Sequence, residues 1–259
     1  MDLGIRGKTA IVCAGSRGLG RGCAEALAAE GVNLVINGRN AEKLAETAAV
    51  IREQHGVDVV EVAADIGSES GRSAVLAATD QVDILINNNG GPPPGLWSDW
   101  GKDEWLHAVE QNMITPIMMI NAVLPAMMSR GWGRIVNITS QSVKSPIPVL
   151  GLSNGARAGL TGFVGGTSRQ VASSGVTINN LLPGIHDTDR ATALDQGAAS
   201  AQDISFEDAR KQRELSIPTH RYGTAEEFGA TCAFMCSQHA GYMIGQNILL
   251  DGGSVNTTL

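Results

Sequence analysis

The residues with the clearest chemical meaning form a glycine-rich turn, Gly15-Ser16-Arg17-Gly18-Leu19-Gly20. This turn lies between an apolar run that predicts a strand, 8–14, and a run that predicts a helix, 18–30. Glycines permit positive φ and let the backbone approach a pyrophosphate, and a helix N-terminus offers N–H groups and partial positive charge. The turn therefore predicts a nucleotide phosphate site, with the spacing G-x-x-x-G-x-G instead of the commoner G-x-G-x-x-G.

The end of the next predicted strand indicates which nucleotide binds. That strand, 32–37, ends at Asn37 and is followed by Arg39, where a site for NAD usually carries Asp or Glu. Arg17 supplies a second guanidinium from inside the glycine turn, and two such groups suit a 2′-phosphate. We therefore expect NADP(H) as the favoured cofactor, with NAD(H) as the alternative.

The elements that must position these residues alternate along the chain. Apolar runs predict strands at 8–14, 32–37, 57–63, 82–87, 134–139, 176–182 and 246–250. Helical patterns occur at 18–30, 40–54, 68–79, 102–129, 152–174 and 224–237. This alternation predicts a single Rossmann-type, doubly wound α/β fold over 1–259, in which a seven-stranded parallel sheet has helices on both faces.

Two segments give an irregular pattern. One is the glycine- and proline-rich stretch 90–95, and the other runs from 185 to about 219. Both follow predicted strands, and ligands in such folds bind beyond the carboxyl ends of the strands. We therefore expect both to border the site, the second as a substrate lid or as a mobile surface excursion.

Composition excludes several classes of protein. The formal net charge of −7 argues against nucleic-acid binding. The longest strongly apolar stretch, 116–128, is shorter than the roughly 20 residues that cross a bilayer, and the first residues lack a signal pattern. The four cysteines do not suggest a disulfide framework, and the Cys232, Cys236 and His239 group is better explained by helix packing than by a metal. We expect a cytoplasmic protein without a metal or membrane partner.

Several motifs in order resemble the short-chain dehydrogenase/reductase family, and closely its 3-oxoacyl-carrier-protein reductase branch. They are the glycine turn, Asp65 after the third strand, Asn87-Asn88-Asn89-Gly90, Asn112, Ser140, Pro183-Gly184 with Thr188, and the C-terminal 245–253. The resemblance covers nearly the whole chain. It implies an oxidoreductase that transfers a hydride between a nicotinamide and an alcohol or carbonyl group of a small molecule.

The resemblance also implies cofactor roles. Gly15, Gly18 and Gly20, with the intervening Ser16 and Leu19, would carry the pyrophosphate. Asp65 and Ile66 would lie at the adenine, and Asn88, Asn89 and Gly90 would support the cofactor, with Asn89 in place of the usual alanine. The nicotinamide carboxamide would be held by the segment that contains Pro183, Gly184, Ile185 and Thr188.

The catalytic centre departs from the family pattern. The family uses a serine, here Ser140, an asparagine that holds a relay water, here Asn112, and a Tyr-x-x-x-Lys pair. This chain has Ser153 and Arg157 where that tyrosine and lysine would stand. A phenol has a pKa near 10, whereas an aliphatic alcohol is a much weaker acid and arginine does not readily release its proton.

A reorganised centre can still be active, because positioning supplies much of the rate of hydride transfer. We expect Ser140 and Ser153 to bracket the reacting oxygen and Arg157 to hold the nicotinamide ribose and stabilise developing negative charge. The proton would come through a water near Asn112 or from His186.

Two other functions stay open. A catalytically silenced NADP-binding sensor or scaffold would explain why the catalytic pair is the part that changed. A serine hydrolase is more remote: the 151–155 stretch reads G-x-S-x-G around Ser153, and His186 or His220 with Asp187 would complete a triad. That motif needs a strand before the serine, and 144–148 is a poor strand.

The sequence says less about substrate and assembly. Lys144, His186 and Arg190 would give the mouth of the site a polar or anion-binding rim, which suits an anionic or sugar-like substrate, including a hemiacetal oxidised to a lactone. The family implies a homotetramer built through 102–129, 152–174 and the last strand. A methionine-rich face, Met113, Met118, Met119, Met127 and Met128, fits either that interface or core packing.

Overall fold

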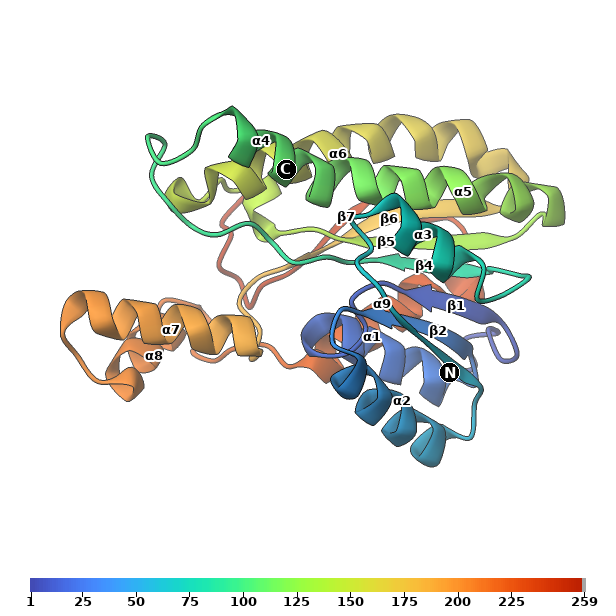
Figure 1. The fold of residues 1–259 in the computed structure, drawn as a ribbon, viewed down its shortest axis with the longest axis horizontal. Coiled ribbons are helices and arrows are strands. Elements are labelled where there is room, and N and C mark those ends of the chain that lie inside the picture. The colour runs from blue at the N-terminus through green and yellow to red at the C-terminus, as the bar shows by residue number, and fades with distance from the viewer. Residues whose placement is uncertain (258–259) are drawn as a thin grey trace.

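Seven parallel strands form one sheet in the computed structural model, which describes residues 1–257 (Figure 1). The strand order is β3-β2-β1-β4-β5-β6-β7. The strands are β1 Thr9–Val12, β2 Asn33–Gly38, β3 Val59–Ala63, β4 Ile84–Asn87, β5 Gly133–Ile138, β6 Val176–Pro183 and β7 Asn247–Leu250. The order reverses between β1 and β4, and ligands of doubly wound sheets bind at such a point.

Helices cover both faces of the sheet (Figure 1). One face carries α1 (Gly18–Ala29), α2 (Ala41–His55) and α9 (Ala225–Met235), and the other carries α3 (Glu69–Leu76), α4 (Lys102–Val109), α5 (Thr115–Arg130) and α6 (Gly151–Val171). The short, fully buried strands explain this arrangement: in β4, Ile84 and Ile86 belong to the core under α1 and α9, and Leu85 belongs to the core under α5 and α6. The predicted fold class and all seven strands are confirmed.

The long helix predicted at 102–129 is wrong in one respect. A π-helical turn, η1 (Glu110–Ile114), separates α4 from α5. The apolar spacing of the sequence did not reveal this turn, because a single π-helical turn adds only one residue to the helical repeat. The turn contains the candidate residue Asn112, so it belongs to the site.

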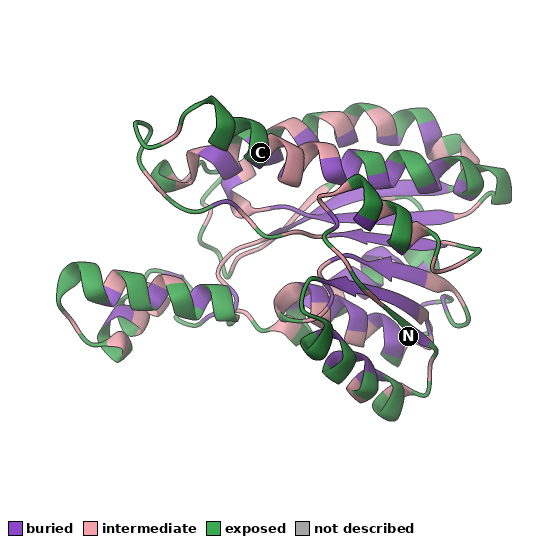
Figure 2. Ribbon diagram, in the orientation of Figure 1, coloured by how far each residue is buried: buried purple, intermediate pink, exposed green. Residues whose placement is uncertain are grey.

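The segment from 185 to about 219 is also more regular than predicted. It contains two helices, α7 (Asp189–Gln202) and α8 (Phe206–Leu215), which project from the body of the molecule (Figure 1). Figure 2 shows that most of their surface is exposed or partly exposed. The hydrophobic cluster beside them is small and consists of Ala191, Ile217 and Tyr222. The apolar periodicity that would predict a helix is therefore absent from the sequence.

A polar cluster takes the place of a large apolar core in this α7–α8 lobe. Asp195 is fully buried; its Oδ1 accepts hydrogen bonds from Arg213 Nη1 at 2.7 Å and from the Tyr222 hydroxyl at 2.8 Å. Burial, together with the bond to Asp195, raises the pKa of Tyr222 to about 12. The cluster therefore ties α7, α8 and the segment that follows them together.

The methionine-rich face divides between core and surface. On α5, Met119 and Met127 are fully buried, whereas Met118 and Met128 are partly exposed. The helical run Lys102–Arg130 is long and apolar enough to cross a membrane by length and composition alone, but half of its most apolar window is buried in the fold. Its apolar character is thus largely accounted for by packing on the sheet.

Candidate active site

The glycine turn follows β1 with a backbone that few other sequences adopt. Ala14 and Gly18 both have positive φ, 49° and 54°, and the Gly15 N–H donates to the Asn37 carbonyl at 2.8 Å. A Cβ on Gly20 would lie 2.2 Å from the Ala14 carbonyl oxygen and 2.8 Å from Asn88 Nδ2. Such distances are not tolerated, so glycine is required at position 20 for steric reasons.

The start of α1 has the features of an anion site. Its N-cap, Arg17, is extended and makes no capping bond, and the first turn carries no acidic residue. By contrast, α2, α3 and α9 begin with side-chain caps from Asn40, Ser68 and Thr224. The N–H groups and partial charge of α1 are thus directed at a ligand instead of a side chain, and this turn fits a pyrophosphate.

The two candidate residues for the 2′-phosphate are both exposed at this end of the sheet. Arg17 Nη1 lies 3.3 Å from Asp189 Oδ2, in an ion pair whose side chains are more than two-thirds exposed. Pairs of this kind contribute little, so the guanidinium can exchange that carboxylate for a phosphate. Asn37 lies at the end of β2 as predicted, and its Nδ2 donates to the Val62 and Ala64 carbonyls, which ties β2 to the end of β3.

The remaining adenosine candidates follow β3. The Asp65 carboxylate accepts a hydrogen bond from the Gly67 N–H at 2.9 Å, and Ile66 is buried. The Ser16 side chain lies against Gly38, at the end of β2. The structure thus brings the turn, the end of β2 and the end of β3 together, as the sequence predicted.

A small cavity with room for about one water lies at the carboxyl ends of β1, β4 and β5. Its wall brings together candidates from four separate parts of the chain, among them Ile66, Asn88, Asn89, Asn112 and Arg157. Asn89 is fixed there by Gln111, because its Nδ2 donates to Gln111 Oε1 at 2.8 Å and its Oδ1 accepts from the Gly90 N–H. Two of the four catalytic candidates, Asn112 and Arg157, therefore line the same cavity as cofactor candidates.

The π-helical turn directs a polar group into this cavity. Asn112 is buried, its Nδ2 donates weakly to the Ala108 carbonyl at 3.4 Å, and its Oδ1 makes no hydrogen bond within the protein. Thr115 also lines the cavity, and its buried Oγ1 likewise makes none. A buried polar atom costs free energy unless it is hydrogen-bonded, and a cavity of this size has room for water at these atoms.

Ser153 and Arg157 face each other one turn apart on α6. Arg157 Nε donates to Ser153 Oγ at 3.2 Å, and Nη1 donates to the Ile138 carbonyl at the end of β5 at 2.8 Å. Arg157 is 8% exposed, and burial followed by the charge of Arg190 lowers its pKa to about 10. The guanidinium therefore stays protonated at neutral pH and is held in one orientation.

Ser140 lies just after β5, at the start of a short 3-10 turn, η2 (Gln141–Val143). Its Oγ accepts a hydrogen bond from the Ser142 N–H at 3.1 Å. Because the Oγ atoms of Ser140 and Ser153 both act as acceptors within the protein, each hydroxyl keeps its own hydrogen for a substrate oxygen.

The expected nicotinamide segment follows β6. The Gly184 N–H donates to the Leu250 carbonyl, and a Cβ on Gly184 would lie 2.5 Å from Asp251 Cα. Thr188 is the N-cap of α7, and its side chain lies against Gly18 of the glycine turn. The segment from Pro183 to Thr188, which includes Ile185, therefore connects β6 to the lobe beside the phosphate turn.

A chain of four asparagines across the sheet was missed from the sequence. Asn87, Asn137, Asn180 and Asn247 are register partners on β4 to β7, and each side-chain Nδ2 donates to the Oδ1 of the next at 2.8–3.0 Å. Asn87 also donates to the Pro116 carbonyl in the first turn of α5. The ladder ties the strand ends to the helix beside Asn112. The only sequence signal was an asparagine in each strand that joins the ladder.

His186 lies elsewhere than one sequence hypothesis required. Its ring packs edge-on against Phe228 at 5.2 Å between centroids, and burial lowers its pKa. It lines a second cavity, of about 790 Å³, with Arg221 and Glu227 and with none of the catalytic candidates. His186 is therefore badly placed to deliver a proton to the cavity of Arg157.

The hydrolase hypothesis is wrong. A 3-10 turn, η3 (Pro148–Leu150), precedes Ser153 in place of a strand, and Ser153 lies in the first turn of α6. Asp187 is held by Arg210 through two hydrogen bonds, at 3.1 and 2.8 Å.

The two tyrosines of the chain do not replace the missing phenol: Tyr222 is enclosed in the lobe, and Tyr242 is fully exposed.

Comparison with known proteins agrees with this geometry. The family model described as enoyl-(acyl carrier protein) reductase matches residues 13–255. The chain belongs to the short-chain dehydrogenase/reductase family. The 3-oxoacyl-[acyl-carrier-protein] reductase FabG of Escherichia coli K12 is 33% identical to this chain over 254 residues, which cover 97% of this chain and 98% of FabG. The NADPH-dependent reductase BacG of Bacillus subtilis is 30% identical, over 96% of this chain and 98% of BacG.

A solved structure in the family is similar over the whole length. The L-sorbose reductase of Gluconobacter frateurii, in complex with NADPH and L-sorbose, has a TM-score of 0.94 at 27% identity, covering 99% of this chain and 100% of that chain. The short-chain dehydrogenase/reductase family and the oxidoreductase class predicted from the sequence are both confirmed.

Proposed function

We propose that this chain transfers a hydride between NADP(H) and the carbonyl or alcohol group of a small molecule, through a centre made of Ser140, Ser153, Arg157 and Asn112. One observation carries the proposal. Arg157 is buried, charged and oriented on the wall of the same cavity that holds the cofactor candidates Asn88 and Asn89. Burying a charge is costly, and a catalytic use for it explains why the chain keeps it.

The cofactor residues of this chain support NADP(H). The uncapped start of α1 and the close-packed Gly20 would hold the pyrophosphate, and Arg17 with Arg39 would bind a 2′-phosphate. BacG is named as NADPH-dependent, and the L-sorbose reductase binds NADPH. When bound, the nicotinamide supplies or accepts the hydride.

In this proposal the side chains manage the charge and the proton. Arg157 uses two of its five N–H donors on Ser153 and Ile138, which leaves donors for a ribose hydroxyl and for negative charge on the reacting oxygen. The hydroxyls of Ser140 and Ser153 would bind that oxygen. A water held at Asn112 Oδ1 would provide the proton, because the atom is buried and makes no bond within the protein.

The finer assignments are also proposals. FabG, BacG and the L-sorbose reductase are named for different substrates, so the substrate is proposed only as a small carbonyl or hydroxyl compound, anionic or sugar-like.

We further propose a homotetramer in the cytoplasm, with α4, α5, α6 and β7 at the interfaces. Exposed Trp105, Leu106 and Met118 on α4 and α5 support that interface. Light scattering during gel filtration would give the mass.

A matrix of cofactors and substrates tests the proposed function. Binding of NADPH and NADH would be measured by fluorescence, followed by turnover of ketones, β-keto esters and sugars. We expect NADPH to bind at least about tenfold more tightly, since two guanidiniums meet a phosphate, and we expect turnover of one class. Tighter binding of NADH would contradict the roles of Arg17 and Arg39. Tight NADPH binding with no turnover across the panel would favour the silenced sensor or scaffold.

A further inference from the structure

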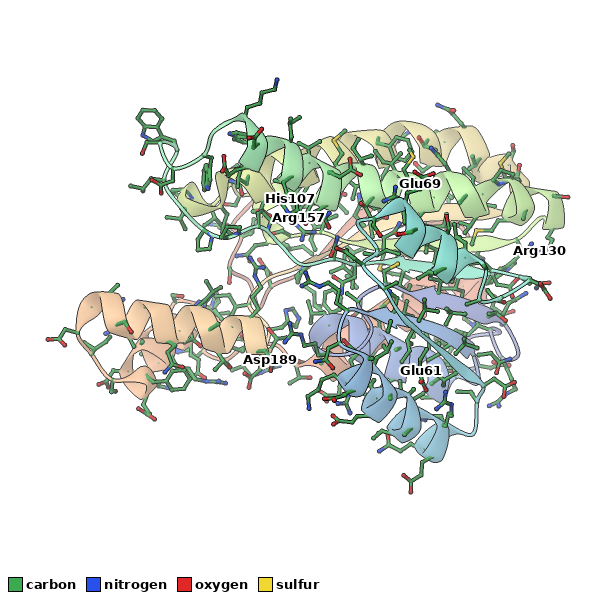
Figure 3. The ribbon with its side chains drawn as sticks, in the orientation of Figure 1. Glu61, Glu69, His107, Arg130, Arg157 and Asp189 are labelled. Atoms are coloured by element: carbon green, nitrogen blue, oxygen red, sulfur yellow. The ribbon has the colours of Figure 1, made fainter. Side chains whose placement is uncertain are left out.

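Arg190 links the α7–α8 lobe to the segment that follows β4. It stands in the first turn of α7, and its Nη1 and Nη2 donate to the carbonyls of Gly91 and Pro92 at 3.0 and 3.1 Å. Those residues follow β4 and the Asn87–Gly90 motif, so the guanidinium joins the lobe to the edge of the cofactor cavity. Figure 3 places Arg157 and the start of α7, at Asp189, on opposite sides of the strand ends.

The arginines around the site fall into two groups. Four of them pair with a carboxylate: Arg17 with Asp189, Arg210 with Asp187, Arg213 with Asp195 and Arg221 with Glu227. Within residues 1–257, Arg157 and Arg190 take part in no ion pair, and both bind only carbonyl or hydroxyl oxygens. The two unpaired cations are close enough that the charge of Arg190 acts on Arg157.

Among the described residues, no carboxylate is paired with Arg157. Here the partner of Arg157 is the hydroxyl of Ser153, which does not ionise near neutral pH. The mouth of the site therefore carries two positive charges that protein groups leave unbalanced, and such a field attracts an anion.

We propose that the substrate is an oxo acid whose carboxylate is bound by Arg190, while its carbonyl oxygen faces Arg157, Ser140 and Ser153. This inference rests on the proposed reductase function. Arg190 uses two of its five N–H donors on Gly91 and Pro92, and the planar guanidinium suits a carboxylate through two parallel hydrogen bonds.

The chemistry leaves the carboxylate unchanged. In the reducing direction the carbonyl carbon gains a hydride from the cofactor, and the oxygen gains a proton from solvent. The product is a hydroxy acid, and the two electrons lost by the cofactor equal those gained by the carbonyl. Arg190 acts as a specificity-determining residue, and Arg157 stabilises the oxygen that becomes negative.

The test compares an oxo acid with its methyl ester, which carries the same carbonyl without the charge. Both would be assayed with the wild type, with Arg190→Gln, and with Lys211→Gln, a control that removes an exposed cation of α8. NADPH affinity and thermal unfolding would be measured for each variant. Calorimetry would record binding of the oxo acid itself, independently of turnover.

We expect the wild type to prefer the acid over the ester by about 10- to 100-fold in kcat/KM, as for hydrogen bonds between charged groups. Arg190→Gln should remove that preference by raising KM for the acid, with the ester and NADPH affinity unchanged, and Lys211→Gln should match the wild type. Equal kcat/KM for acid and ester in the wild type would overturn the proposal. So would an equal loss on both substrates in Arg190→Gln, or weaker NADPH binding, which would assign Arg190 to the cofactor.

Failure of the reductase function gives a different result. In that case the NADPH-loaded wild type would turn over neither the acid nor the ester nor any uncharged carbonyl compound. The role of Arg190 would still be decided by calorimetry: oxo acid binding that is lost in Arg190→Gln and kept in Lys211→Gln supports it, and equal binding by all three proteins overturns it.

Discussion

The phosphate turn and helix α6 of this protein differ in what they share with the rest of the family. The turn at Gly15–Gly20 has the backbone its family needs, down to a glycine whose Cβ would meet a carbonyl oxygen at 2.2 Å. Helix α6 carries the proposed catalytic residues Ser153 and Arg157, at positions where the resemblance implies a tyrosine and a lysine. One region is defined by backbone sterics, and the other by side-chain chemistry.

This difference shows how one family can bind one cofactor and vary its chemistry. Few substitutions fit the turn, since its shape depends on positive φ and on contacts between backbone atoms. On α6, a side chain can change while the helix and the Ile138 carbonyl that receives it stay in place. A family match therefore predicts cofactor binding more firmly than it predicts the acid–base step.

In the phosphate turn, a large effect is expected from Gly20→Ala. The new methyl would overlap the Ala14 carbonyl and Asn88 Nδ2, so the turn must move. We expect NADPH to bind about 100-fold more weakly and the free energy of unfolding to fall by about 2 kcal/mol, measured by fluorescence titration and denaturant melts.

The control for this variant is Gly197→Ala on α7, where a Cβ meets nothing within 4 Å. That change should leave NADPH affinity intact and raise stability by about 0.5–1 kcal/mol, as glycine in a helix is unfavourable. Normal NADPH binding by Gly20→Ala would show that the turn is less constrained than its geometry indicates.

Ser140→Ala tests the other region. If the Ser140 hydroxyl binds the reacting oxygen as proposed, its removal should lower kcat by about 100-fold, and NADPH affinity should stay within about threefold. The measurement is steady-state turnover together with fluorescence titration of the cofactor. If turnover is unchanged, Ser140 does not contact the reacting oxygen.

A smaller effect is expected in the lobe from Tyr222→Phe. The buried Asp195 would keep Arg213 but lose the hydroxyl at 2.8 Å, which should cost about 1–3 kcal/mol. Hydrogen exchange should show faster opening of α7 and α8, with the sheet unaffected. Uniform opening of the whole molecule would mean that the lobe and the sheet unfold as one unit.

The pH dependence of stability should contain a modest contribution from His186. Burial lowers its pKa in the folded state below the ordinary value near 6.5, so the unfolded chain takes up the proton first. Stability should therefore be fully present above about pH 6.5 and decline as the pH falls below it. His186→Gln should flatten that decline in thermal melts between about pH 7 and 5; an unchanged slope would show that other groups cause it.

Much of the fold was predictable because its signals are local. Buried strands such as Ile84-Leu85-Ile86 are continuous apolar runs, and the glycine turn has its own spacing. The α7–α8 lobe was not predicted as helical, because a buried carboxylate, Asp195, holds it together in place of an apolar stripe. The π-helical turn at Asn112 was missed because it changes hydrogen bonds and not the residue pattern.

The sequence proposed a set of site residues but not the contacts that they make within the protein. Sequence order proposed Asn112, Ser140, Ser153 and Arg157 as the catalytic centre, and this assignment stays a prediction. The sequence did not indicate that Arg157 binds the Ile138 carbonyl, that Asn37 is used within the sheet, or that four asparagines form a ladder. Those contacts depend on strand register, which follows from packing of the whole sheet.

The most direct test of the reorganised centre compares kcat of the wild type with that of Arg157→Gln, on one carbonyl substrate under saturating NADPH. We expect the wild type to turn over and the variant to be slower by about 100- to 1,000-fold, because a neutral amide cannot stabilise negative charge on the reacting oxygen as a guanidinium does. Equal turnover by the two proteins would contradict the role of Arg157, and with it the idea that the changed pair is a working catalytic centre.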